Sequence, residues 1–421
     1  MRVCDLNTLF IDGGAGGANT YLREKARYFT EMGGAVEHHL IVPAGCTERR
    51  RLFGSTLHAI RSPRLPQNPQ HRLLVHFPLV RRILQDLQPD VVEVDCSYLL
   101  GHVAASALSR RRVLLVGYYH VHLPVQGGTA VAARAGFPLR APLGALVERF
   151  AWRYLEYCMS PLARIFVTAR DVLDRLSERG FDRLVHVPMG VNLDLFRPEG
   201  RMKATDGERT ILYVGRMSEE KDLPVLFQAF DALSRERSGL RLRVVGGGPM
   251  QAVAERFAAG RSDVVVHGHC PYGPELASHY ASADVLAMPS RYETFGLAIL
   301  EALACGVPVV AAAEGGPRDI IRPAVGALAR PNDPADLAAK LAGVLDRAPP
   351  ARRCRRRVEE KFSWSRTFAR LLEVYSGTRT RSVPKDRPVS MPAPTLRGVG
   401  AGTRRVAGRS TVGSLPTGGV P

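Results

Sequence analysis

Two glutamates frame an apolar run in the last third of the chain. The segment "SRYETFGLAILEALACGVPVVAA" covers residues 290–312, and Glu293 and Glu301 stand eight positions apart within it. A carboxylate beside apolar surface is unfavourable unless a partner compensates it. The run between them has helical composition and stops at Gly306, so we expect Glu293 just before a helix and Glu301 on its second turn. In the alternative, Glu293 caps the turn and Glu301 faces solvent.

The start of the predicted helix is suited to an anion. Its free backbone N–H groups and its positive dipole end favour phosphate. Carboxylates do not bind phosphate, but they accept hydrogen bonds from sugar hydroxyls. A nucleotide sugar would satisfy all three groups, with phosphates at the helix start, ribose on one glutamate and hexose on the other.

Cations and bare backbone follow two other predicted strands. "LYVGRMSEEKDL" places Arg216 and Lys221 in the loop after a strand, where α/β folds bind ligands. The two cations suit a diphosphate, although Lys221 taken alone also fits a solvated helix start. "VVGGGPM" ends a strand in the run 246–248, where Gly247 and its neighbours let a ligand approach the backbone closely.

The opening strand is followed by "GGAGGAN", which contains Gly13, Gly14, Gly16 and Gly17. Asn19 occupies the last glycine position of a G-x-G-x-x-G pattern, so a dinucleotide cofactor is poorly supported. A glycine loop that faces a cleft still offers backbone N–H groups to a phosphate oxygen.

The chain offers a histidine but no metal clamp at the predicted ligand edge. His120 follows the strand in "GYYHVHLP", where it fits either a contact to a sugar hydroxyl or a structural role. No D-x-D occurs, so a metal ion on a diphosphate has no obvious ligands. We therefore expect no metal and no other cofactor.

The elements that must position these residues form two series. Short apolar runs alternate with stretches of helical length, pause at the polar segment "EGRMKATDGERT", and then resume. Such runs indicate parallel strands buried on both faces. We expect two doubly wound α/β domains, 1–197 and 208–361, that face each other across a ligand cleft. An amphipathic helix follows at 362–377, and the Pro-, Gly- and Arg-rich tail 378–421 is predicted to be disordered.

The composition of the chain indicates its cellular compartment. The chain has 421 residues, 45% of them hydrophobic, and no apolar run long enough to span a membrane. The seven cysteines are scattered, without a C-x-x-C pair or a histidine at metal-ligand spacing, which indicates thiols in a reducing compartment. We expect a cytoplasmic protein.

The net charge of +18 points to an anionic partner. Eight Lys and Arg residues and one Asp lie from Thr378 onward, so the tail contributes +7 and the rest +11. An anionic membrane surface and nucleic acid are the usual partners of such a charge. No nucleic-acid motif is present, so we expect no nucleic acid. "HRLLVHFPLVRRILQDL" fits either a membrane-surface substrate or a core helix with a solvated basic face.

Over about residues 1–377 the chain resembles the retaining glycosyltransferases of family 4, which have the GT-B fold of two Rossmann-like domains. The most specific part is "ETFGLAILE" with the following "ALACGVPVVA" and "EGGPRDII". The likeness extends to "VGRMSEEKD", "VVGGGPM", "ASADVLAMPS", "VPMGVNLDLFRP" and "FSWSRTFARLLEVY".

The resemblance implies a role for each matched residue. Glu293 would contact the donor hexose and Glu301 the ribose, and Arg216 and Lys221 would neutralise the diphosphate. His120 would contact the transferred sugar. Backbone groups near the phosphates and the nucleotide would come from Gly16, Gly17, Gly247, Phe295, Gly296 and Leu297. The helix 362–377 would cross back onto the first domain.

Three positions depart from the family pattern. Asp222 stands where members more often have a helix-start glycine. Met189 replaces a frequent asparagine, and Asn192 replaces a frequent aspartate. None of these substitutions removes a proposed ligand.

The expected reaction is transfer of a hexosyl residue, with mannose from GDP-mannose as the leading donor, to a lipid or saccharide hydroxyl with retention. A UDP-hexose is the alternative donor. A nucleotide-sugar epimerase and a non-catalytic basic scaffold are the alternatives of other classes. An epimerase converts the donor alone, and a scaffold does not need Arg216 or Glu293.

Overall fold

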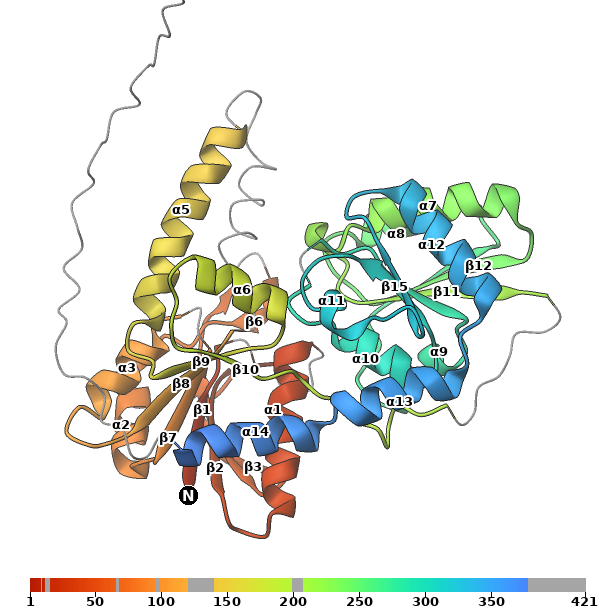
Figure 1. Ribbon diagram of the computed structural model, residues 1–421. Helices are drawn as coiled ribbons and strands as arrows, with labels where there is room; N and C mark the ends of the chain where they lie inside the picture. Colours follow the sequence, from red (N-terminus) through yellow and green to blue (C-terminus); the bar gives the residue numbers. More distant parts are fainter. Residues whose placement is uncertain are drawn as a thin grey trace, which may run out of the picture. The chain divides into compact units, whose positions relative to one another are not determined.

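The computed structural model describes residues 1–8, 10–11, 16–65, 68–95, 98–119, 140–198, 207–291 and 293–377 (Figure 1). For residues 68–71 and 140–143 it describes the backbone alone. Gly13, Gly14, His120 and the tail 378–421 lie outside these ranges, so the predictions made for them stay predictions.

The first half is built on one sheet with the strand order β10-β9-β8-β7-β1-β2-β4-β3. Every pairing in it is parallel except β3 with β4. Its strands are β1 (Arg2–Leu6), β2 (Glu37–Ala44), β3 (Glu48–Leu52), β4 (Ser55–Arg61), β7 (Val91–Asp95), β8 (Leu114–Tyr119), β9 (Arg164–Val167) and β10 (Leu184–His186). A separate antiparallel pair joins β5 (Arg64–Leu65) and β6 (Asn68–Arg72). The helices are α1 (Gly17–Glu31), α2 (Phe77–Leu87), α3 (Leu100–Ala107), α5 (Arg140–Met159) and α6 (Arg170–Glu178).

The second half repeats the design with the order β13-β12-β11-β14-β15-β16, all parallel. The strands are β11 (Arg209–Val214), β12 (Leu240–Val245), β13 (Val264–His267), β14 (Val285–Met288), β15 (Val309–Ala312) and β16 (Gly326–Ala329). The helices are η1 (Glu219–Lys221), α7 (Leu223–Glu236), α8 (Gln251–Ala258), α9 (Pro274–Ala281), α10 (Leu297–Ala304), α11 (Pro317–Ile320), α12 (Pro334–Arg347) and α13 (Ala351–Lys361). The strand order reverses between β11 and β14, which is where doubly wound sheets bind ligands.

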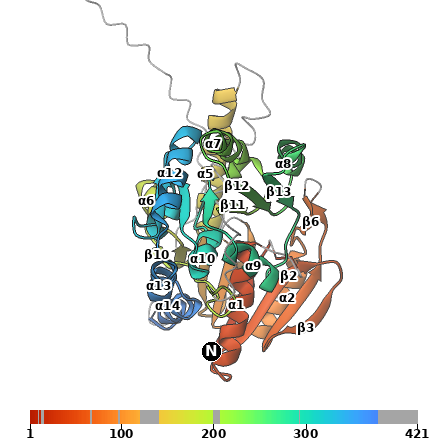
Figure 2. The same cartoon turned by 90° about the vertical axis from the view of Figure 1, so that its right-hand side faces the viewer.

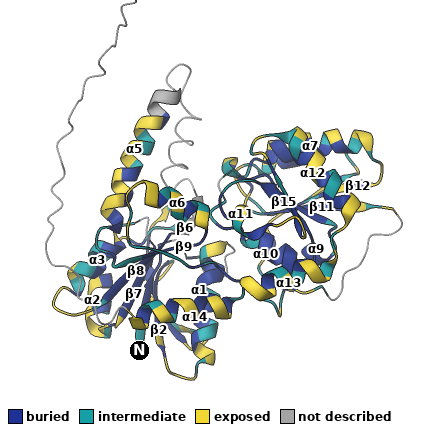
Figure 3. Ribbon diagram, viewed as in Figure 1, coloured by how far each residue is buried: buried dark blue, intermediate teal, exposed yellow. Residues whose placement is uncertain are grey.

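Burial explains the apolar runs of the sequence. Every residue of β7, β8, β14 and β15 is buried, as expected for parallel strands that are covered by helices on both faces (Figure 3). In α2, Val80 and Leu84 are buried while Arg81 and Arg82 are exposed. This segment therefore is a packed helix with a solvated basic face, which was one of its two sequence interpretations.

The link between the halves crosses the start of the last helix, α14 (Trp364–Gly377). Val191 donates its N–H to the Phe362 carbonyl at 3.0 Å and bridges to Ser363. A Cβ on Gly190 would lie 2.2 Å from the Trp364 nitrogen, so this crossing requires a glycine. α14 then packs on α1, where Phe368 lies 5.8 Å from the ring of Tyr21 and 5.3 Å from that of Tyr28 (Figures 1 and 2).

A buried ionic cluster fixes α14 to the first half. The Lys25 ammonium lies 2.8 Å from Asp5, 3.0 Å from Glu93 and 3.1 Å from the Tyr375 hydroxyl. Tyr375 donates to Glu93 at 2.6 Å. Burial by itself lowers the pKa of Lys25, but the two carboxylates outweigh it and the pKa is raised. Tyr375, near the end of the described chain, therefore belongs to the same buried cluster as Asp5, near its start.

Candidate functional site

Three loops that carry predicted site residues meet at one edge of the second sheet. They follow β11, β12 and β14, which are neighbours in the sheet and run parallel. Their carboxyl ends therefore open on the same side. Lys221 and Glu293 meet there: the Lys221 ammonium donates to the Glu293 carboxylate at 2.7 Å, and both side chains are mostly buried. The sequence placed these residues in separate loops, and the fold makes them an ion pair.

Arg216 is held by a different acid. Its guanidinium contacts the Glu220 carboxylate, which also accepts from the Ser218 hydroxyl at 2.7 Å. Burial raises the pKa of Glu220, but Ser218 and then Arg216 outweigh it and keep the pKa below its ordinary value. Arg216 itself is half-exposed. Both cations predicted to bind phosphate are thus paired with carboxylates. A diphosphate that binds them would have to compete with Glu220 and Glu293.

The starts of α10 and α1 approach each other. Gly296 precedes α10 with φ 100°, and neither helix has a side-chain cap on its first N–H groups. A Cβ on Gly17, at the start of α1, would lie 3.6 Å from the Leu297 side chain at the start of α10. Gly16 has φ 115°, and no atom of the described residues lies within 4 Å of its Cβ position. The first turns of two helices, one from each half, thereby lie near each other, and the positive ends of their dipoles favour an anion between them.

Glu301 is buried rather than solvated. Tyr280 of α9 donates to its Oε2 at 2.6 Å, while no described residue bonds Oε1. Burial raises the pKa of Glu301 to about 7, against the lowering effect of the Tyr280 hydrogen bond. The solvated-face interpretation of Glu301 is therefore wrong, and its Oε1 has no hydrogen-bond partner among the described residues.

The glycine run after β12 serves mainly to pack backbone. A Cβ on Gly246 would lie 1.9 Å from the Gly215 carbonyl, and one on Gly248 would lie 2.5 Å from the Met217 carbonyl. Because these two positions have no side chain, the backbone on either side of Arg216 can pack directly against the glycine run. Gly247 differs, because the nearest atom to its Cβ position is 3.6 Å away on Gln251. It is the member of the run with room for a ligand.

The Glu293 loop is clamped from two sides. Within the second half, Gly316 donates its N–H to the Glu293 carbonyl at 2.9 Å. A Cβ on Gly315 would meet the same carbonyl at 2.1 Å. From the first half, the Thr168 hydroxyl donates to the Thr294 carbonyl at 2.9 Å, and Asp171 accepts from the Gly315 N–H at 3.1 Å. The sequence interpretation did not single out Thr168 or Asp171, since neither stands in a recognisable motif.

The departures from the family pattern have local causes. Asp222 adopts the left-handed conformation, φ 50° and ψ 41°, which explains why glycine suits this position. Its carboxylate pairs with the Arg291 guanidinium at 2.7 Å, a contact that a glycine cannot make. Asn192 accepts from the N–H groups of Asp194 and Leu195 and donates to Glu24 at 3.1 Å. Met189 is simply buried.

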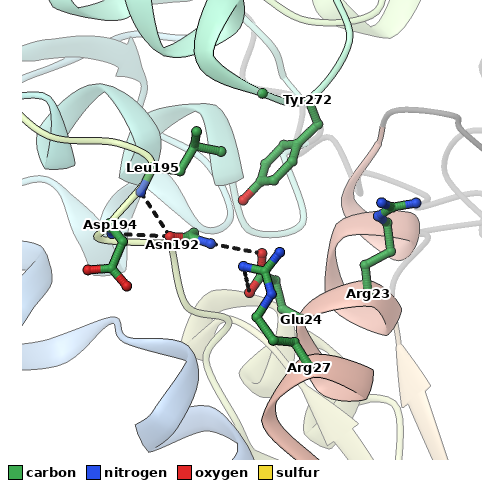
Figure 4. Close-up of a pocket in the computed structure, with 8 residues that line it drawn as sticks. Arg23, Glu24, Arg27, Asn192, Asp194, Leu195 and Tyr272 are labelled. Carbon is green, nitrogen blue, oxygen red and sulfur yellow. Dashed lines mark hydrogen bonds and ion pairs between the residues drawn. The ribbon is translucent and has the colours of Figure 1, made fainter. Parts of the chain in front are cut away.

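A polar cavity of about 390 Å³ lies beside the link between the halves (Figure 4). Tyr272, from the loop before α9, faces Glu24 of α1 across it, and Asn192 lies between them. Its other lining residues are Arg23, Arg27, Asp194, Leu195 and Gly273. Side chains of both halves line this cavity, but none of the predicted site residues does.

Two family models match the chain in succession. The model described as Glycosyltransferase Family 4 matches residues 15–195, and the model described as Glycosyl transferases group 1 matches residues 200–361. The two matches meet near the polar break at which the sequence pattern restarts.

Individual proteins with named activities are similar over most of the chain. A D-inositol 3-phosphate glycosyltransferase of Thermobispora bispora is 31% identical, over 86% of this chain and 90% of that protein. A GDP-mannose-dependent alpha-(1-6)-phosphatidylinositol dimannoside mannosyltransferase of Mycobacterium tuberculosis is 30% identical, over 80% of this chain and 86% of that protein. The sucrose-phosphate synthase of Thermosynechococcus elongatus has the same fold, with a TM-score of 0.69, 19% identity and coverage of 90% and 99%.

Proposed function

Because the chain belongs to the family 4 and group 1 glycosyltransferases and has their GT-B fold, we propose that it transfers mannose from GDP-mannose, with retention, to a hydroxyl of a lipid or saccharide. Transfer from a nucleotide-sugar donor follows from the family. The choice of mannose rests on the named activity of the M. tuberculosis relative.

One observation carries the proposal. The Lys221–Glu293 pair, the start of α10 and the Glu301 oxygen that no described residue bonds all belong to the second half, and Gly17 of the first half lies near the start of α10. A nucleoside diphosphate sugar carries two negative phosphates between two hydroxylated rings. We infer that the ribose lies on Glu301, the diphosphate at the start of α10 and the hexose beside Glu293.

The reaction requires that the departing diphosphate be stabilised while positive charge develops on the sugar ring. Lys221, Arg216 and the first N–H groups of α10 would supply that stabilisation, because preorganised charges act most strongly in a site that excludes water. The family view assigns the acceptor's proton to the leaving phosphate itself. Glu293 would orient the hexose, and His120 is proposed to contact the same sugar.

Donor identity can be tested directly. Melting temperature is measured with GDP-mannose, UDP-glucose, GDP and UDP, since a ligand that binds only the folded protein raises it. We expect the largest rise with GDP-mannose and, with an acceptor present, an α-mannoside by NMR. A larger rise with UDP-glucose would show that the donor is a UDP-hexose. Conversion of the donor to its epimer without an acceptor would show that the protein is an epimerase. Rates that Mg²⁺ or Mn²⁺ do not raise would support a metal-free diphosphate site.

The acceptor is proposed to lie at an anionic membrane surface. On α5 the exposed side chains Leu146, Phe150, Tyr154 and Tyr157 follow at spacings of four, four and three, which places them on one helix face. Exposed Arg149 and Arg153 border that face, and Trp152 and Leu155 are buried on the other side. Apolar and tyrosine side chains bordered by arginine fit the interface of a membrane with anionic lipids.

The location follows as part of the same proposal. No helix in the described ranges combines the length and apolar character needed to cross a bilayer. The six cysteines described are all free thiols, five of them buried. We infer a cytoplasmic enzyme that binds the membrane peripherally, with no nucleic-acid partner.

A further inference from the structure

Cysteine, glutamate and histidine side chains gather where the edge strand β13 meets α9. Cys270 lies in the connecting loop, and Glu275 and His279 lie one helical turn apart on α9. One ligand atom from each of the three lies within 4.8 Å of the other two. The ring of His267, the last residue of β13, lies tilted against that of His279, with centroids 4.8 Å apart. None of these residues takes part in the reaction proposed above.

The donor types are those of a zinc-class ion. Thiolate, imidazole and carboxylate are the three ligands that Zn²⁺ takes from proteins, and a tetrahedral ion needs them within a few ångströms of one another. Cys270 is buried while Glu275 is exposed, so the group is anchored on one side and open to solvent on the other. Along the sequence, Glu275 and His279 stand five and nine positions after Cys270. The fold brings their side chains to Cys270, because α9 follows the loop that leaves β13.

We propose that Cys270, Glu275 and His279 bind a divalent transition-metal ion of the zinc class. The bound ion would tie the loop 268–273 to α9. Tyr272 of this loop lines the cavity beside the link, and Tyr280 of α9 donates to Glu301. The site is therefore structural and separate from any contact with the diphosphate.

Cobalt provides a direct test. The chelator-treated full chain is titrated with Co²⁺, and the thiolate-to-cobalt charge-transfer absorption is recorded. We expect one equivalent to saturate this absorption in the parent protein and in Cys46→Ser, whose cysteine is exposed and outside the group. Cys270→Ser should abolish it. A missing band in the parent protein, or a band that survives Cys270→Ser, would overturn the proposal.

Zinc affinity tests the other two ligands. His279→Gln and Glu275→Gln should each weaken Zn²⁺ binding at least about tenfold by calorimetry, because mutation of even an outer-shell partner typically costs that much. Melting of the metal-free variants verifies that they are folded. Unchanged affinity in both variants would contradict the assignment. GDP-mannose binding is measured on the same samples without metal, so failure of the metal site and failure of the proposed donor site give different results.

Discussion

Glu301 is the residue whose environment makes the clearest prediction about pH. Its pKa in the folded protein is about 7, above the ordinary value of 4.5, because burial disfavours the charged form. The protonated form thus stabilises the fold fully below about pH 4.5, and this contribution is lost as the pH rises through about 7. A ribose hydroxyl donates best to the ionised form.

We therefore expect GDP to bind more tightly as the pH rises from about 6 to about 8, with release of a proton. Calorimetry in buffers of different ionisation enthalpy measures both quantities. Glu301→Gln should bind GDP weakly and with little pH dependence over this range. An unchanged pH dependence in that variant would assign the titration to another group.

Substitutions of the two glutamates should also change different kinetic constants. Glu301 is proposed to hold the ribose, which is the same in the ground and transition states, so Glu301→Gln should mainly raise the donor KM. Glu293 is proposed to face the hexose, whose shape and charge change during transfer, so Glu293→Gln should mainly lower kcat. GDP contains no hexose and should bind normally to the Glu293 variant. The reverse pattern would exchange the two roles.

The two cations should differ as well. Lys221→Ala and Arg216→Ala each remove a preorganised positive charge, and we expect each to cost about 2–4 kcal/mol of transition-state stabilisation. Lys221→Ala should be the more severe, because it also leaves the mostly buried Glu293 without its partner. Lys340→Ala, at an exposed position of α12, is the matched control. Near-normal kcat/KM in both variants would contradict the phosphate assignment.

At the level of elements, the first half grips the loop that carries Glu293. Thr168, where β9 leads into α6, donates to the Thr294 carbonyl of that loop at 2.9 Å. Asp171 acts indirectly, because it accepts from the Gly315 N–H in the neighbouring loop after β15 and pairs with Arg318 at 2.9 Å. Arg175 of α6 adds a contact to Glu314 at 2.8 Å. The backbone beside Glu293 is thus positioned partly by the opposite half, so we expect a change in these contacts to alter the placement of Glu293.

We expect Asp171→Asn to lower kcat about tenfold or more, since a hydrogen bond to a charged group contributes about 1.5–3 kcal/mol. GDP affinity should change little, because the contacts proposed for GDP lie elsewhere. Asp182→Asn, at an exposed position of the same half, is the control. A fall in melting temperature with unchanged kcat would limit Asp171 to a structural role.

At the scale of the whole molecule, the basic charge and the apolar face of α5 bear on where the enzyme works. Deletion of 378–421 should leave the melting temperature unchanged, because the segment contains too little apolar sequence to pack. Binding to vesicles that contain phosphatidylserine should fall after the deletion and fall further in Phe150→Ser with Leu146→Ser. Vesicles of phosphatidylcholine alone are the control. A large loss of thermal stability on deletion would show that the tail packs on the body.

The sequence by itself determined the doubly wound architecture and the family, and it placed Arg216, Lys221 and Glu293 in loops that follow strands. Those features depend on local patterns: β-branched runs, helix-length spacers, and the glutamate, glycine and cation motifs at strand ends. Only the tertiary structure decided that Lys221 pairs with Glu293, that Glu301 is buried on Tyr280, that Thr168 holds the Glu293 loop, and that Asp171 holds the loop beside it. Each of these contacts joins residues far apart in the chain, so their protonation and orientation arise from burial and neighbours that no local pattern encodes.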